Sequence, residues 1–237
     1  MPAPDQSQVN DLTAKALTIH RLLIEQYGDH PWRPPLDPVS ELVLTILSQN
    51  TNDVNRDQAW QRLRERFPAP KGTGGPGWEE IIAAPTEELA EAIRPGGLAD
   101  TKAPRIQEAL RTILAERGEL SLDFLAQMPV EEAKAWLMQL KGVGPKTAAI
   151  ILLFSLGRPA FPVDTHIHRL SRRLGLISSN TSREKAHRLL EELLPPEFYY
   201  AFHLNLIAHG REVCRARVPR CGLCVLQARC DYYQGTG

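Results

Sequence analysis

Cysteine is absent from the first 213 of the 237 residues, and no apolar run approaches the roughly 20 residues that a membrane-spanning helix needs. Lysine plus arginine equals aspartate plus glutamate at 28 each, which excludes a uniformly basic chain. The first ten residues, MPAPDQSQVN, lack the basic and apolar regions of a secretory signal. We therefore expect a cytoplasmic protein without membrane contacts.

The balanced charge hides a difference along the chain. Residues 160–237 hold 11 basic and 7 acidic side chains, whereas residues 1–159 hold 17 and 21. A positive bias in one part fits a polyanion site on one face, and an ordinary solvated surface explains the same numbers. Charge alone therefore leaves both interpretations open.

Strand patterns are missing too, whereas apolar residues recur at helical spacing along nearly the whole chain. The spacing predicts about a dozen helices, with the first over residues 12–24 and the last over 198–207. Proline and glycine predict a surface loop at 68–78 and a rigid linker, suited to a domain boundary, at 31–38. We expect an all-α protein of one large or two modest domains.

The four cysteines lie within the last 24 residues, with the spacing C-x6-C-x2-C-x5-C: Cys214, Cys221, Cys224 and Cys230. Disulfides are disfavoured in a cytosolic chain, and core cysteines would be scattered. A metal centre remains, either zinc or an iron–sulfur cluster, because both accept four thiolates. Only one pair has the short C-x2-C spacing that zinc ribbons repeat, which favours iron–sulfur.

The segment 139-QLKGVGPKTAAIILLF-154 predicts a helix, a Gly-Val-Gly turn, and a second helix that starts at Pro145. We expect Gly142 and Gly144 to permit positive φ and close approach of another backbone. Their N–H groups beside a helix N-terminus form an anion site of phosphate size. A plain connection between helices, without a ligand, is the alternative.

Lys146 lies in the first turn of that second helix and is either an amine nucleophile or a phosphate contact. Eighteen residues later, Asp164 precedes a helix, either as its cap or as a half-buried carboxylate near Lys146. His166 and His168 follow without a metal partner at ligand spacing, which favours structural roles for both.

These pieces in this order resemble endonuclease III, of the helix-hairpin-helix-GPD superfamily of DNA base-excision glycosylases. The resemblance runs from about residue 38 to Cys230. It implies two all-α domains that flank a DNA-binding cleft. One is a six-helix barrel over 31–158, with the helix-hairpin-helix at about 130–157. The other combines 1–30 with 159–237 and carries a C-terminal 4Fe–4S cluster loop.

Carried over by residue, Lys146 resembles the family's Schiff-base lysine, Asp164 its catalytic carboxylate, and the four cysteines its cluster ligands. The stretch 45–54 resembles the segment whose amide side chain fills the gap left by an extruded base. Asn50 aligns with the filler, although the family more often has glutamine, and Gln49 is adjacent. In 96–103, Leu98 matches the wedge. The expected DNA contacts are Gln49, Asn50, Leu98, Lys141, Gly142, Val143, Gly144, His166, Arg215, Arg217 and Arg220.

The resemblance implies a monomer that binds duplex DNA with damaged bases or abasic sites and, in a bacterium, associates with the nucleoid. It implies removal of oxidised pyrimidines and cleavage 3′ to the lesion by β-elimination. This chain departs from the family in Lys141 for proline, in Ala99, and in a longer glycine-rich loop at 68–77. The alternatives are a monofunctional mismatch or adenine glycosylase, a non-catalytic helix-hairpin-helix protein, and an electron carrier.

Overall fold

The computed structural model describes residues 6–69 and 75–235, so residues 70–74 of the predicted glycine-rich loop lie outside the description. The described residues form twelve α-helices with short 3-10 and π turns. They contain no β-strand, only an isolated antiparallel bridge between Pro68 and Pro76. The prediction of an all-α fold is confirmed. None of the described helices is long and apolar enough to span a membrane.

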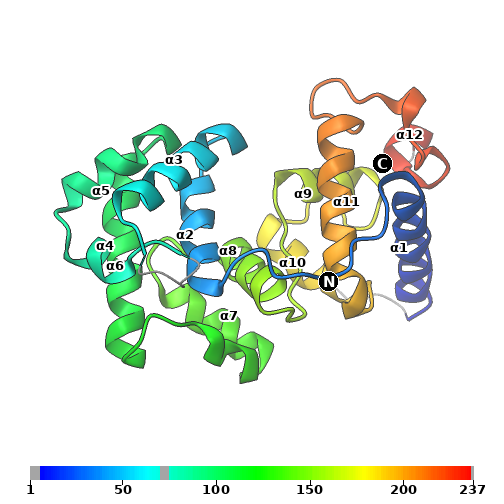
Figure 1. Cartoon of the computed structure of the whole chain (residues 1–237). Helices are drawn as coiled ribbons and strands as arrows, with labels where there is room; N and C mark the ends of the chain where they lie inside the picture. The colour runs from blue at the N-terminus through cyan, green and yellow to red at the C-terminus, as the bar shows by residue number, and fades with distance from the viewer. Residues whose placement is uncertain (1–5, 70–74, 236–237) are drawn as a thin grey trace. The chain divides into compact units, whose positions relative to one another are not determined.

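The chain divides into two compact units, which are coloured along the sequence in Figure 1. Unit 1 combines Met1–Trp32 with Pro159–Gly237, and unit 2 is the continuous stretch Arg33–Arg158. The first division falls inside the proline-rich segment 31–38. Unit 1 is therefore built from two segments that lie far apart in the sequence.

Unit 2 is built around α2, in which nine of the eleven residues are buried. Asp37 caps this helix by accepting hydrogen bonds from the N–H groups of Val39 and Ser40. Helices α3, α6 and α8 pack against α2, and α5 packs against α3 and α6. The helices of unit 2 are α2 (Pro38–Ser48), α3 (Asp53–Arg66), α4 (Trp78–Ala83), α5 (Thr86–Ile93), η1 (Arg94–Gly96), α6 (Ala99–Arg117), η2 (Asp123–Gln127), α7 (Val130–Gln139), α8 (Pro145–Ile150) and the π-helical η3 (Ile151–Ser155).

Unit 1 joins its two segments through α1 and α11, which pack side by side. Phe161 and Phe202 are fully buried in this unit, with ring centroids 5.9 Å apart. Lys15 of α1 also forms an ion pair with Asp231 of α12. The helices of unit 1 are α1 (Gln6–Tyr27), α9 (Thr165–Arg173), α10 (Arg183–Glu191), η4 (Pro196–Phe198), α11 (Tyr199–Glu212), η5 (Cys221–Leu223), η6 (Gln227–Arg229) and α12 (Asp231–Gln234).

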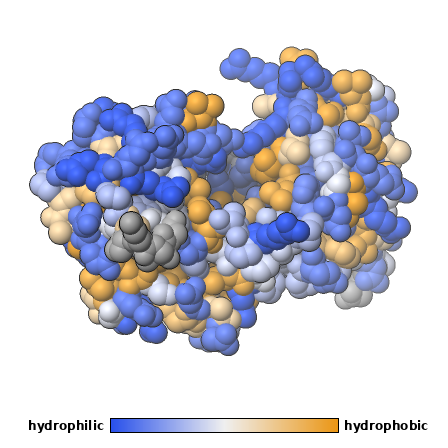
Figure 2. Space-filling view, in the orientation of Figure 1, coloured by the Kyte–Doolittle hydropathy of each residue, from blue (hydrophilic) through white to orange (hydrophobic). Residues whose placement is uncertain are grey.

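The face of each unit seen in Figure 2 is largely hydrophilic, with small apolar patches between polar side chains. Several large apolar residues of unit 1 are nevertheless exposed around the cysteine segment: Val218, Leu223, Val225, Tyr232 and Tyr233. Apolar side chains that are scattered among charged ones in this way are normal for a protein surface.

Gly175, directly after α9, tests how the C-terminal segment is held. It has φ +70°, and a Cβ there would overlap the Asp231 carboxylate. We expect Gly175→Ala to lower the free energy of unfolding by about 1–2 kcal/mol from backbone strain, and by up to about 1 kcal/mol more from the displaced ion pair. Gly28→Ala is the matched control, because Gly28 has φ +91° and open space around it. Equal losses in chemical denaturation would contradict the expectation for Gly175.

Candidate functional site

The turn between α7 and α8 has the geometry of a helix-hairpin-helix. Gly142 adopts φ +87°, and the N–H of Val143 donates to the Leu140 carbonyl at 3.0 Å. Val143 is buried and anchors the turn. Gly144 is the N-cap of α8 at φ −106°, with open space where a Cβ would lie. The expectation of positive φ is thus right for Gly142 and wrong for Gly144, whose extended backbone any residue can adopt. The group close to Gly142 is the Arg105 side chain, so the approach of another backbone stays a prediction.

Two lysines mark this hairpin. Lys146 is exposed in the first turn of α8, and Lys141 precedes the turn. Lys141 forms an ion pair with Glu108 of α6 at 2.9 Å, so its added charge is partly offset. Arg105, also on α6, packs against the turn: a Cβ at Gly142 would lie 3.1 Å from its Cδ. The hairpin therefore has a basic side chain that its own sequence segment does not show.

The filler and wedge positions are the two non-glycine residues of the described chain with positive φ. Asn50, just after α2, has φ +54°, and Leu98, just before α6, has φ +51°. Both are exposed, Leu98 by 56%. The left-handed conformation costs an L-residue about 1–2 kcal/mol, and such strain gathers at functional positions. Gln49 is placed differently, because its Nε2 donates to the Gly142 carbonyl at 3.0 Å. This bond ties residues 49–52, which we call the filler loop, to the hairpin.

Asp164 is the N-cap of α9, and its Oδ1 accepts from the Ile167 N–H at 2.8 Å. Its carboxylate is half-buried, the capping interpretation is confirmed, and the functional role beside Lys146 stays a prediction. Two hydrogen bonds to neighbouring helices hold the segment that leads to Asp164. The Phe161 N–H donates to Glu191 at 2.8 Å, and the Pro162 carbonyl accepts from His203 at 3.1 Å. These bonds to α10 and α11 therefore hold the backbone two to three residues before Asp164.

The two histidines after Asp164 differ in surroundings. His168 bonds through Nε2 to the Thr181 carbonyl at 2.8 Å, as a structural histidine does. His166 accepts from the Arg169 guanidinium at Nδ1, at 3.1 Å. Because Arg donates only, the neutral His166 ring carries its proton on Nε2. His166 thus keeps one N–H that can donate to a ligand.

Helix α9 connects Asp164 with the cysteine segment. Arg169 donates to the carbonyls of Gly210 and Cys214, each at 2.9 Å from Nη2. One turn on, Arg173 donates to the carbonyls of Arg215 and Ala216 at 2.8 and 2.9 Å. A single helix therefore carries the carboxylate at its N-terminus and holds the cysteine segment with its last turns.

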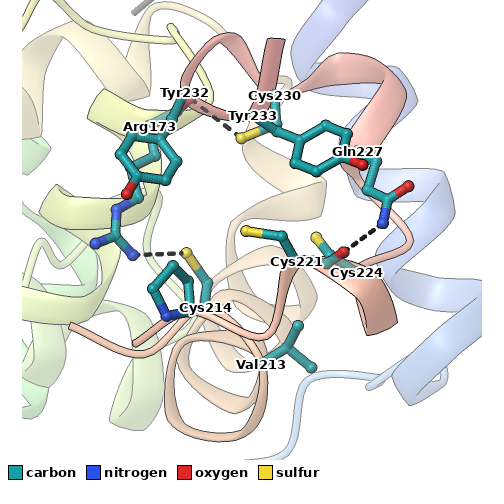
Figure 3. A pocket seen from close by; sticks show the side chains of 10 residues that line it. Arg173, Val213, Cys214, Cys221, Cys224, Gln227, Cys230, Tyr232 and Tyr233 are labelled. Carbon is teal, nitrogen blue, oxygen red and sulfur yellow. Dashed lines mark hydrogen bonds between the residues drawn. The ribbon is translucent and has the colours of Figure 1, made fainter. Parts of the chain in front are cut away.

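The four cysteines line one small cavity in unit 1, which Figure 3 shows from close by. Arg173, Gln227, Tyr232 and Tyr233 also line it. A zinc ion, with Zn–S bonds of about 2.3 Å, would need the four sulfurs gathered tightly around one point. Within residues 6–69 and 75–235, no group of three or more His, Cys, Asp or Glu side chains has that arrangement.

Nitrogen donors point at two of the sulfurs. Arg173 Nη1 lies 3.3 Å from Cys214 Sγ, and His209 Nε2 lies 3.3 Å from Cys224 Sγ. Burial lowers the pKa of His209 to about 4, so the ring is neutral and has one N–H. Tyr27 Oη lies 3.0 Å from His209 Nδ1. The only assignment that suits a thiolate has Tyr27 donating to Nδ1 and Nε2–H donating to sulfur.

Two of the four thiols, Cys224 and Cys230, resist ionisation without a cation. Burial raises the pKa of Cys224 and of Cys230, and the neighbouring thiols raise it further. Four thiolates around one cavity therefore require positive charge at its centre, which a metal centre supplies. The donor set, the cavity and the N–H groups together fit a thiolate-bound metal group.

The structure thus brings several predicted residues together. In unit 2, Gln49 meets Gly142, and in unit 1, α9 joins Asp164 to Cys214. Lys146 belongs to unit 2 and Asp164 to unit 1. Arg215, Arg217 and Arg220 are all exposed.

Four contributors have no local sequence signal: Arg105, Arg169, Arg173 and His209. Arg169 has one near partner, His166, but the contacts that build the site join residues at least 15 positions apart in the chain. No short motif therefore contains both members of those contacts. The run of arginines at 169–173 is visible in the sequence, but on its own it indicates only a charged helix face.

Comparisons with known proteins agree with this geometry. The profile of the HhH-GPD superfamily of base excision DNA repair proteins matches residues 43–196. Endonuclease III of Thermotoga maritima is 33% identical over 201 residues, which are 85% of this chain and 86% of that protein. A putative DNA glycosylase of Arabidopsis thaliana is 36% identical over 170 residues, 72% of this chain and 55% of that protein.

Solved structures give the same result. A non-covalent endonuclease III–DNA complex matches with a TM-score of 0.77 and 28% identity, covering 94% of this chain and 97% of that one. A thermostable thymine-DNA glycosylase matches with a TM-score of 0.76 at 23% identity, covering 94% and 98%, which shows a shared fold alone. The chain therefore belongs to the HhH-GPD superfamily of base excision DNA repair proteins, and endonuclease III enzymes are among its homologues.

Proposed function

We propose that this protein is a bifunctional DNA glycosylase and AP lyase that removes oxidised pyrimidines from duplex DNA. The observation that carries the proposal is Lys146, an exposed lysine in the first turn of the helix that follows the Gly142 turn. A monofunctional glycosylase needs no amine there, because water is its nucleophile. The proposal also draws on the similarity to endonuclease III enzymes over most of the chain.

Lys146 acts as the nucleophile. Its neutral amine attacks C1′ of the deoxyribose, the N-glycosidic bond breaks, and the base leaves with that electron pair and takes up a proton. The C1′–N adduct opens to an imine, which acidifies the C2′ proton. Loss of this proton expels the 3′ phosphate and cleaves the strand by β-elimination.

Asp164 acts at the same sugar. Its carboxylate stabilises the positive charge that builds on the deoxyribose as the base leaves, and it assists the proton transfers. Because Oδ1 accepts the capping hydrogen bond of α9, Oδ2 is the oxygen that faces the positive charge on the sugar. The proposed reaction requires both Lys146 and Asp164 to act on one nucleotide.

Backbone and loop residues hold the DNA. The N–H groups of the Gly142–Gly144 turn and the start of α8 bind a phosphate, which positions the duplex without reading its sequence. Asn50 fills the space that the extruded base leaves, and Leu98 wedges into the opposite strand. The bond from Gln49 to the hairpin supports Asn50, rather than Gln49, as the filler. Arg105 adds a phosphate contact beside Lys141, and His166 donates from Nε2.

The cavity of unit 1 holds a 4Fe–4S cluster, with Cys214, Cys221, Cys224 and Cys230 as ligands. Bound there, the cluster cross-links the cysteine segment and has no part in the bond-breaking steps. Arg173 and His209 donate N–H groups to its thiolates. The segment between the first two ligands then presents Arg215, Arg217 and Arg220 to DNA phosphates.

A monofunctional glycosylase of the same superfamily is the second candidate. A thymine-DNA glycosylase shares the fold, and since one fold hosts several substrate classes, the fold does not decide between the two candidates. The monofunctional candidate predicts base release that depends on Asp164 and no covalent intermediate. The two candidates therefore differ in a single measurable product.

Borohydride trapping separates them. The protein is mixed with a duplex that contains thymine glycol, reduced, and run on a denaturing gel. We expect a covalent protein–DNA adduct that falls at least about 100-fold in Lys146→Ala and in Asp164→Asn, because each removes a group that acts in bond breaking. Lys185→Ala, an exposed lysine on α10, is the matched control and keeps the adduct. Base release without any adduct would establish the monofunctional candidate instead.

The cluster has its own test. We expect the purified protein to be brown, with broad visible absorbance and about four iron and four sulfide ions per chain. Cys224→Ser should lose most of this absorbance because it replaces a soft thiolate ligand. A colourless protein with one zinc ion per chain would show that the site binds zinc.

Arg173 tests the link between α9 and the arginine-bearing segment. Arg173→Met removes bonds to two carbonyls and to Cys214 Sγ, so the segment should lose its fixed shape. We expect the Kd for duplex DNA to rise about 10-fold, or about 1.4 kcal/mol, and trypsin to cleave after Arg215 or Arg217 faster. Arg172→Ala, an exposed neighbour, is the control. Equal Kd values for both variants would remove Arg173 from DNA binding.

A further inference from the structure

Lys102 is the one fully buried lysine of the described chain, at 1% exposure. Its ammonium forms no ion pair among the described residues. Instead Nζ donates to the Leu47 carbonyl at 2.7 Å and to the Gly96 carbonyl at 2.8 Å. Burial lowers the pKa of this lysine, as expected for a cation without an anionic partner. Burying a lysine ammonium without an anionic partner costs free energy, and packing alone does not explain why Lys102 is buried.

The two carbonyls belong to two separate loops. Leu47 lies in the last turn of α2, three residues before Asn50, and Gly96 ends η1, two residues before Leu98. Both carbonyls lie at helix ends, where no further turn supplies an N–H partner. One ammonium with several donors satisfies both at once. The filler loop and the wedge loop are thereby joined at a single atom.

Lys102 also holds the wedge loop through its backbone. Its own N–H donates to the Leu98 carbonyl at 2.9 Å, as the first turn of α6 forms. Gly96 is buried, and a Cβ there would lie 3.1 Å from Ala59 Cβ and 3.8 Å from the Leu47 carbonyl oxygen. The two loops therefore approach each other closely where Lys102 joins them. Next to this junction each loop carries one residue with a strained positive φ angle at its tip, Asn50 in one loop and Leu98 in the other. Such a backbone conformation persists only where the surrounding structure holds it.

We propose that Lys102 is a positioning residue for base extrusion, which sets the separation and orientation of the Asn50 and Leu98 tips before DNA binds. The proposal rests on the proposed function, in which these tips enter the base stack. Two probes that enter one duplex from different loops need a fixed spacing, because an error of about 1 Å is enough to lose most of such an effect. A tie buried at the root of both loops supplies that spacing.

The test measures extrusion without catalysis. In an Asp164→Asn background, 2-aminopurine beside the lesion in a thymine glycol duplex brightens as stacking is lost. We expect Lys102→Met, which keeps the volume but not the donors, to lower the extent of extrusion about 10-fold. Affinity for undamaged duplex should change less than about 3-fold, since phosphate contacts lie elsewhere. Extrusion within about 2-fold of the parent in Lys102→Met overturns the proposal.

Coupling between sites distinguishes positioning from stability. If Lys102 acts through the two loop tips, its replacement should matter little when the tips themselves are removed. Adding Lys102→Met to the Asn50→Ala, Leu98→Ala double variant should therefore lower extrusion only slightly, and the losses are not additive. Fully additive losses overturn the proposal. Ile106→Ala, in the buried face of the same helix, is the stability control. The same loss of extrusion in this variant, at equal thermal stability, also overturns it.

The same set of variants separates this proposal from the proposed function. If Asn50→Ala and Leu98→Ala each leave extrusion unchanged, the two loop tips do not act on DNA and the inference about Lys102 fails, whereas the proposed lyase activity stands or falls with the adduct at Lys146. If those two variants impair extrusion and Lys102→Met does not, only the inference about Lys102 fails. Impairment in all three, with the non-additive triple variant, supports both.

Discussion

Carbonyl groups without partners at the ends of helices are the constraint on which most of this structure depends. An all-α chain of short helices creates many of them, since each helix leaves its last four carbonyls without N–H partners. Long cationic and amide side chains supply the donors here. Lys102 bonds to Leu47 and Gly96, Gln49 to Gly142, and Arg158 to Ala126 and Met128. The loops near the proposed DNA contacts are therefore held by specific bonds rather than by packing alone.

Helix α9 shows how this constraint serves a site. Asp164 supplies the cap at its start, and Arg169 and Arg173 bind carbonyls of the cysteine segment at its other end. A shift of the helix would move both the Asp164 carboxylate and the cysteine segment. Because α9 is only nine residues long, we expect it to move as one rigid body, so that a displacement at one end is passed to the other. The carboxylate and the cysteine cavity are consequently parts of one framework in unit 1.

The helices, the hairpin and the cysteine set could be predicted from the sequence because each depends on residues close together in the chain. Periodicity predicts helices over 12–24 and 198–207, which correspond to α1 and α11, and the Gly-x-Gly spacing predicts the turn at Gly142. At Gly144 the prediction of positive φ fails, because residue type alone does not report the extended backbone that the N-cap position adopts. Lys102, Arg173 and His209 could not be found in this way. Their roles depend on partners 6 to 55 residues away, which only the folded chain brings near.

The discontinuous origin of unit 1 has a consequence for the newly made chain. Lys15 and Asp231, which pair in this unit, lie 216 residues apart in the sequence. During synthesis unit 2 is complete as one uninterrupted stretch while α1 still lacks α11. An amphipathic helix thus leaves the ribosome well before its partner and must stay soluble until the last segment arrives. The cysteines come late, with α12 after them, so any metal centre closes a unit of which most other parts have already been translated.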